Sequence, residues 1–138
     1  AFGTMACAAA EVHWFLERTD HLEAIEAALR EKLLPPDFRV GSDEVRHALA
    51  CCCALDARYD EAGHWFAEAR LVLAEQGGTP QLAICDFDEA LMHARRAAPG
   101  DPAAARPLLK AALRQFEAIG MTGWHRRARQ LEATLSGE

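Results

Sequence analysis

Helix-breaking residues divide this chain into stretches that are each about one helix long. The main breaks are Pro35-Pro36, Gly77-Gly78, Pro99-Gly100, Gly120 and Gly123. Between them the chain favours helices over strands, because 29 alanines and 16 leucines stand against four valines, three isoleucines and one tyrosine. The sequence therefore predicts an all-α protein with helices near 3–18, 20–33, 43–56, 60–76, 80–97, 102–119 and 122–136.

Individual residues predict where some of these helices begin. Ser42 carries the hydroxyl of an N-cap residue, and Thr79 is a second such cap, followed by a proline that the first turn accepts. Asp101 is predicted to be a third cap, since it is likewise followed by a proline. Pro107 removes a backbone hydrogen bond inside the sixth helix, so we expect a kink there or a helix that begins only at about Ala105.

Length and charge limit the class of protein. The 138 residues suffice for one compact domain, and no apolar run reaches the roughly 18 residues of a membrane span. With no export signal at the start, we expect a soluble, cytoplasmic protein. Residues 1–69 hold 13 acidic and six basic residues, which argues against direct nucleic-acid binding, and the basic run 125–129 is interpreted as a solvated face.

The five cysteines are predicted to be free, buried thiols. Cys51, Cys52 and Cys53 are adjacent, and consecutive helical residues point about 100° apart, so the three cannot converge on one metal ion. No Cys-x-x-Cys motif occurs. His47 does lie one turn before Cys51, so a metal or thiol protein that uses this pair is one alternative interpretation.

The residue patterns of common catalytic sites are missing. Gly77-Gly78 is followed by no lysine, and the only serines are Ser42 and Ser136, so the sequence has neither a phosphate-binding loop nor a serine nucleophile motif. We therefore expect no enzymatic activity and no cofactor. Binding is the remaining class of function.

Isolated acidic and imidazole groups are predicted to face water. Asp86, Asp88 and Glu89 cluster on the expected helix 80–97, an arrangement more typical of a solvated face than of a cation site. His64 and His93 lack the partner spacing of a His-Glu-x-x-His metal motif, so both are predicted to be surface histidines.

A stripe of small and aromatic residues characterises segment 43–76. In its second helix Ala62, Phe66 and Ala69 recur at four and three residues, which allows two helices to approach closely around one ring. Together with Tyr59, this pattern resembles a tetratricopeptide repeat, although Ala57 stands where that family usually has a turn glycine. Segment 80–119 repeats the pattern with Ala105, Leu109 and Ala112.

The resemblance implies a short right-handed solenoid of antiparallel helix hairpins. Residues 1–36 would be a divergent first hairpin, 43–76 and 80–119 two repeats, and 122–136 a capping helix within a single domain. Residues 119–135 resemble the last helices of such arrays in large bacterial regulators. The resemblance therefore implies a non-catalytic protein-interaction or regulatory module; a sensor of small molecules or peptides is the alternative.

In this family the first helix of each hairpin lines a concave groove. The resemblance thus places five residues against a protein or peptide partner: Glu44, His47, Cys51, Ala54 and Leu55. An acidic to neutral groove suits basic or apolar peptides. Trp65 is predicted to be an exposed aromatic, whereas Trp14 and Trp124 are predicted to lie in the core. A homodimer through uncovered solenoid ends is also expected.

Overall fold

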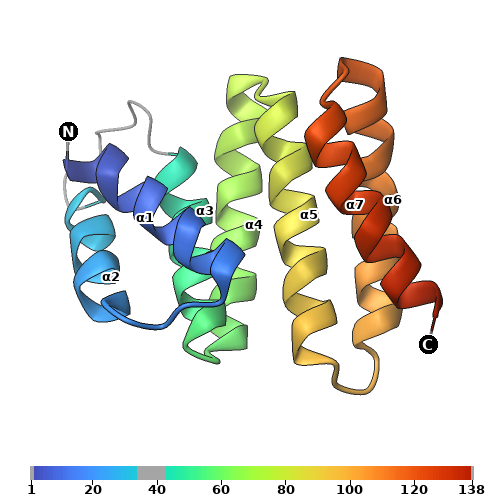
Figure 1. The fold of residues 1–138 in the computed structure, drawn as a ribbon. Coiled ribbons are helices and arrows are strands. Elements are labelled where there is room, and N and C mark those ends of the chain that lie inside the picture. Colours follow the sequence, from blue (N-terminus) through green and yellow to red (C-terminus); the bar gives the residue numbers. More distant parts are fainter. Residues whose placement is uncertain (1, 34–42, 138) are drawn as a thin grey trace. The chain divides into compact units, whose positions relative to one another are not determined.

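The computed structural model describes residues 2–33 and 43–137, with the backbone alone for residues 2–4, 43 and 44. Within these ranges all regular structure is helical (Figure 1). The helices are α1 (Phe2–Leu16), α2 (Leu22–Glu31), α3 (Asp43–Leu55), α4 (Tyr59–Gln76), α5 (Thr79–Arg96), α6 (Asp101–Ile119) and α7 (Thr122–Ser136). The predicted all-α class is confirmed, and each predicted helix has its counterpart within a few residues.

The chain forms two compact units, Ala1–Val72 and Leu73–Glu138. Glycine and proline mark the ends of helices in this sequence, but this boundary falls inside the continuous helix α4. Nothing in the pattern of helix-breaking residues therefore indicates it.

The core of the N-terminal unit is built from α1, α2 and α3, which pack against one another in pairs. Its buried members are Ala6, Ala10, Ile25, Leu29, Val45, Ala48, Leu49 and Cys52. Small residues spaced four apart on α1 let the neighbouring helices approach closely, and Trp14 is buried as predicted. Ala62, Phe66 and Ala69 of α4 are fully buried too, and the Phe66 ring lies 5.9 Å from the His47 ring of α3.

The core of the C-terminal unit lies among α5, α6 and α7, and α5 and α6 run side by side in Figure 1. The buried residues are Ala83, Phe87, Ala90, Ala105, Leu109, Ala112, Leu113, Phe116, Ala128, Leu131 and Leu135. Trp124 packs against this cluster as predicted, stacked on Phe116 at 5.9 Å and edge-on to Phe87 at 5.8 Å between ring centroids. The Arg127 guanidinium lies 4.5 Å from the centre of the Trp124 ring.

Several helices end in a left-handed residue that satisfies the last carbonyl groups. Gly77 has φ +69°, and the following amide of Gly78 donates to the carbonyl of Leu73 at 3.0 Å. Ala57 adopts the same conformation with φ +60°, and the amide of Arg58 donates to the carbonyl of Cys53 at 2.8 Å. A non-glycine residue is strained there by its Cβ.

The predicted starts of two helices need correction. Thr79 is the first residue of α5 rather than its cap, because Gly78 occupies the N-cap position without a side-chain hydrogen bond. Gly100 takes the same place before α6, so Asp101 does not cap it either. The predicted cap Ser42 lies outside the described residues.

Pro107 does not delay the start of α6. The helix runs from Asp101 through Pro107 to Ile119, so the prediction of a start near Ala105 is wrong. The missing proline amide would have bonded the carbonyl of Ala103, and Ala103 is exposed, so water can replace that donor.

Among the helices of residues 2–33 and 43–137, none combines the length and the apolar character that a bilayer crossing demands.

Candidate functional site

The residues predicted to line a groove belong to α3, and most of them are not open to a ligand. Cys51 is 3% exposed and Ala54 is 6% exposed, while His47 and Leu55 are partly buried. The side chain of Glu44 lies outside the described residues. A ligand-contacting role for Cys51 and Ala54 does not fit this burial.

The cysteines are packing residues in the structure. None of the five forms a disulfide, and four of them are buried as predicted, whereas Cys7 is only partly buried. Burial raises the pKa of the Cys52 thiol to about 12, with the Glu26 carboxylate adding to the effect, and burial raises that of Cys53 to about 11. Because the thiolate is the form that attacks electrophiles and binds metals, these two thiols are unreactive near neutral pH.

Trp65 is not the exposed aromatic residue of this chain. Its ring is partly buried against the N-terminal core, and the Arg30 guanidinium lies 5.8 Å from the ring centre. Among the side chains that the structure describes, the large aromatic one that faces solvent is Phe15 of α1, which was not a predicted site residue.

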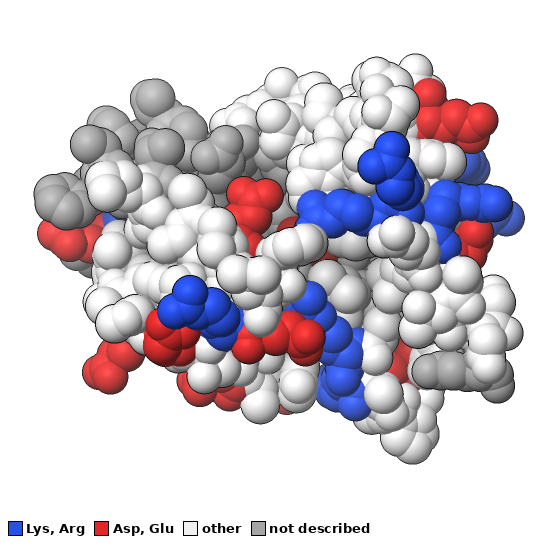
Figure 2. Space-filling model, in the orientation of Figure 1, with Lys and Arg blue, Asp and Glu red and all other residues white. Residues whose placement is uncertain are grey.

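Phe15 belongs to an apolar stripe on the outer face of α1. Met5, Val12, Phe15 and Leu16 are between 50% and 67% exposed, and their spacing places them along one side of the helix. Ala6, Ala10 and Trp14 fill the opposite side. In Figure 2 the surface over α1 is largely uncharged. We call these four side chains the α1 stripe.

The sequence of α1 does indicate an exposed apolar stripe, because this helix lacks a polar face. From residue 5 to residue 16 only Glu11 and His13 are polar. A helix that is apolar on all sides is normally covered on all sides. The α1 stripe departs from that rule, and exposed apolar patches of this kind mark interaction surfaces.

The surroundings of the stripe are acidic. Glu11 and Glu17 adjoin Val12 and Leu16 in the sequence and are exposed, and the unit as a whole contains 13 acidic and seven basic residues in positions 1–72. Next to the end of α1, Arg18 is engaged by Asp20, with its Nε donating at 3.0 Å. This hydrogen bond holds the pKa of the Asp20 carboxyl below its usual range.

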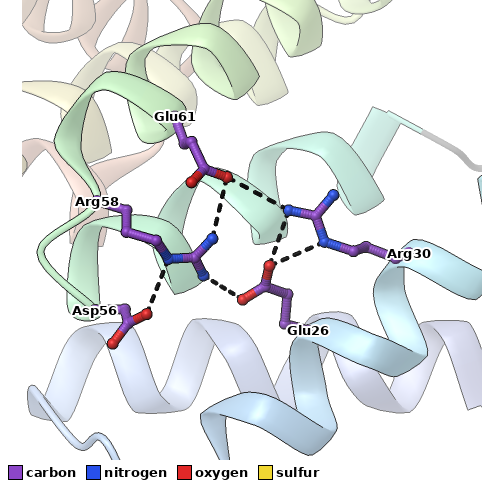
Figure 3. Close-up of polar contacts among 5 residues, drawn as sticks. All are labelled: Glu26, Arg30, Asp56, Arg58 and Glu61. Carbon is purple, nitrogen blue, oxygen red and sulfur yellow. Dashed lines mark hydrogen bonds and ion pairs between the residues drawn. The ribbon is translucent and has the colours of Figure 1, made fainter.

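A network of ion pairs holds the N-terminal unit together at the turn between α3 and α4 (Figure 3). Arg58 donates to Asp56 at 2.8 Å, to Glu61 at 3.1 Å and also to Glu26 of α2. Arg30 of α2 donates to Glu26 at 2.9 Å and lies 3.6 Å from Glu61. The network thus connects α2 to the α3–α4 turn.

The guanidinium and carboxylate groups of this network are paired with one another. Burial alone would raise the pKa of the Glu26 carboxyl, but hydrogen bonds from Arg58 and Arg30 outweigh it and lower that pKa. The same contact with Glu26 raises the pKa of Arg58. Such mutual pairing is typical of a structural clamp rather than a site for a ligand.

A second polar cluster, which no motif in the sequence predicts, joins α5 to α6. The buried carboxylate of Asp101 accepts hydrogen bonds from Nδ1 of His93 at 2.8 Å and from the backbone amide of Ala98 at 2.8 Å. Arg96 adds two more, at 2.6 and 2.9 Å. The prediction that His93 is a plain surface residue is therefore wrong.

A histidine oriented by a carboxylate also occurs in catalytic triads, but here the carboxylate has other partners. The hydrogen bonds from Arg96 are the main reason that the pKa of Asp101 lies far below its usual range. With four donors around it, Asp101 ties the end of α5 to the start of α6. This cluster has a structural role.

The acidic cluster predicted on α5 does not face water. Asp88 is buried, and Asp86 and Glu89 are partly buried. Asp88 shares a buried stripe of α5 with Cys85 and Met92, separate from the stripe of Ala83, Phe87 and Ala90 that enters the C-terminal core. The prediction that this cluster faces water is therefore wrong for Asp88.

An open depression of about 650 Å³ lies at the start of α2. Its lining residues are Thr19, His21, Leu22, Glu23, Ala24 and Ala27. All of them come from one short segment, so the depression lacks the converging walls of a small-molecule site.

Comparison with protein-family models, curated proteins and solved structures gives no match for this chain.

Proposed function

We propose that this protein is a non-catalytic protein-interaction module and that the α1 stripe is its main binding surface. The observation that carries the proposal is the exposure of four large apolar side chains on one face of a helix whose other face is in the core. In water such a face is stabilised when a partner covers it.

The chemistry of the partner follows from the surroundings of the stripe. An apolar helix face fits a groove or helix face of another protein, and acidic residues around it favour basic residues beside the apolar ones. We therefore propose an amphipathic helix with basic flanks as the bound segment. The sequence also led us to expect a basic or apolar peptide as the ligand. The proposed binding surface, however, is α1 rather than α3.

The strength of the interaction can be bounded from the size of the stripe. Covering the exposed halves of four such side chains is worth on the order of 4 kcal/mol, and association itself has a free-energy cost of similar size or larger. The apolar contact alone is therefore weak. Stable binding requires the basic flanks or a second contact elsewhere on the protein.

We also propose that the helix hairpins are tetratricopeptide-like repeats in a short right-handed solenoid, within a larger bacterial signalling or transcription regulator. Two features support the repeats. Ala62, Phe66 and Ala69 are buried as a repeat requires, and the matching residues Ala105, Leu109 and Ala112 are buried in the C-terminal core. The sensor and metal-binding alternatives stay predictions.

Selection of random peptides displayed on phage tests this function. We expect wild-type protein to enrich peptides with apolar residues at helical spacing and basic residues beside them. These peptides should lose binding to Phe15→Lys and keep it with Leu71→Lys. Leu71 is the matched control, because it is 63% exposed on α4 and outside the stripe. Equal binding to both variants would show that α1 is not the binding surface.

Self-association through the same stripe would compete with such peptides. Light scattering across a range of concentrations measures it directly, and Phe15→Lys should then abolish any dimer that wild type forms.

A further inference from the structure

The exposed face of α6 carries a row of basic side chains. Arg106, Lys110 and Arg114 are spaced four residues apart, and all three are exposed. With a rise of about 1.5 Å per residue the row is about 12 Å long. The small or compact residues Ala103, Pro107 and Ala118 share this face, and so does Glu117, which comes three residues after Arg114. We call the three cations the α6 row.

The cations of the α6 row lack acidic partners. Among residues 2–33 and 43–137, none of the three takes part in an ion pair or side-chain hydrogen bond. Other arginines on the surface do find partners: Arg18 pairs with Asp20, and Arg129 pairs with Glu132 at 3.1 Å. The α6 row is thus a local excess of positive charge in a chain whose net charge is −6.

The spacing also opposes helix stability. Like charges four residues apart repel each other across one turn and destabilise a helix. An acidic residue at position 110 would turn both repulsions into attractions. A row that weakens its own helix and remains unpaired is suited to an external negative charge.

We propose that the α6 row binds an acidic helical segment of a partner protein. Carboxylates four residues apart on such a helix match the spacing of the three cations, and the small residues of the face let the two helices approach. This site lies in the C-terminal unit and does not depend on the α1 stripe.

Protein is favoured over nucleic acid as the partner. Nucleic acids are bound by broad basic surfaces that neutralise many phosphates at once. The α6 row offers three cations, and the C-terminal unit as a whole holds eight acidic and eight basic residues. A short acidic helix requires no more than these three contacts.

The experiment uses a labelled alanine-rich peptide with glutamate at three positions four residues apart, and a control peptide with glutamine at the same positions. Binding to the full chain is followed by fluorescence anisotropy at about 20 mM and about 200 mM salt. We expect the glutamate peptide to bind at low salt, to bind more weakly at high salt, and to bind better than the glutamine peptide.

Two charge reversals locate the site. Lys110→Glu should weaken binding of the glutamate peptide about tenfold, because one attraction becomes a repulsion. Arg126→Glu should leave binding within about twofold. Arg126 is the matched control, since it is exposed on α7 and has no ion pair in the part of the chain that the structure describes.

Three outcomes overturn the proposal. The glutamate peptide does not bind at low salt, both variants weaken binding equally, or a single-stranded oligonucleotide of equal charge binds more tightly and loses affinity in Lys110→Glu. The first two exclude a specific acidic site, and the third identifies a nucleic-acid surface. None of these outcomes concerns the α1 stripe, so the proposed function is tested separately.

Discussion

Asp101 is the single residue with most hydrogen bonds in the polar cluster between α5 and α6. We expect Asp101→Asn to lower the free energy of unfolding by about 1–3 kcal/mol, because Arg96 and His93 lose a charged acceptor in a buried position. Urea unfolding followed by circular dichroism measures the change. Glu117→Gln is the control on the same helix. An equal loss of stability in that variant would show that the hydrogen bonds of Asp101 do not stabilise the fold.

The pH dependence of stability follows from the same carboxylate. The pKa of Asp101 is lowered in the folded protein, so its contribution to stability is complete above the pKa of the unfolded state, which is about 3.9. The contribution is lost as pH falls from there toward the folded-state pKa. The difference in stability between wild type and Asp101→Asn should therefore be constant above about pH 5 and shrink below about pH 4. A difference that grows on acidification would contradict this.

Ala57 is strained by its left-handed backbone at the turn between α3 and α4. We expect Ala57→Gly to raise the free energy of unfolding by about 0.5–1 kcal/mol, since glycine adopts this conformation without a Cβ clash. Thermal unfolding measures the shift. Ala67→Gly, at an exposed position inside α4, should lower the free energy of unfolding by about 1 kcal/mol, because glycine is a poorer helix former than alanine. A loss of stability in both variants would show that Ala57 is not strained.

The ends of the helices were predictable from the positions of glycine and proline. A glycine after a helix takes the left-handed conformation, as at Gly77, and this preference is a property of the residue itself. Side-chain caps were not predictable in the same way. The Asp101 carboxylate could accept hydrogen bonds from backbone amides of its own helix or from a neighbouring arginine. It accepts them from Arg96, because hydrogen bonds from a charged donor are stronger.

The α6 row gives a prediction for the stability of its helix. We expect Lys110→Glu to raise the free energy of unfolding by about 1 kcal/mol, because repulsion with Arg106 and with Arg114 becomes attraction. Lys110→Gln should give about half of this gain. Differential scanning calorimetry checks both variants. A loss of stability in Lys110→Glu would show that Lys110 makes a stabilising contact that outweighs its repulsion with Arg106 and Arg114.

At the scale of the whole molecule, the sequence predicted the helices better than the candidate site. Burial of Phe66 followed from a local period, whereas the burial of Ala54 and the exposure of Phe15 depend on which helix faces are covered by others. Those faces are set by contacts between distant segments, which a single sequence does not contain. The boundary inside α4 was unpredictable for the same reason.

Binding of an amphipathic partner helix to the α1 stripe, as proposed, would bury apolar surface on both sides. Because such burial gives a negative heat-capacity change, titration calorimetry with a phage-selected peptide at several temperatures measures it. We predict a negative heat-capacity change for wild type and for Leu71→Lys, and no measurable binding for Phe15→Lys. Unchanged binding by Phe15→Lys, or a heat-capacity change near zero for wild type, would contradict the account.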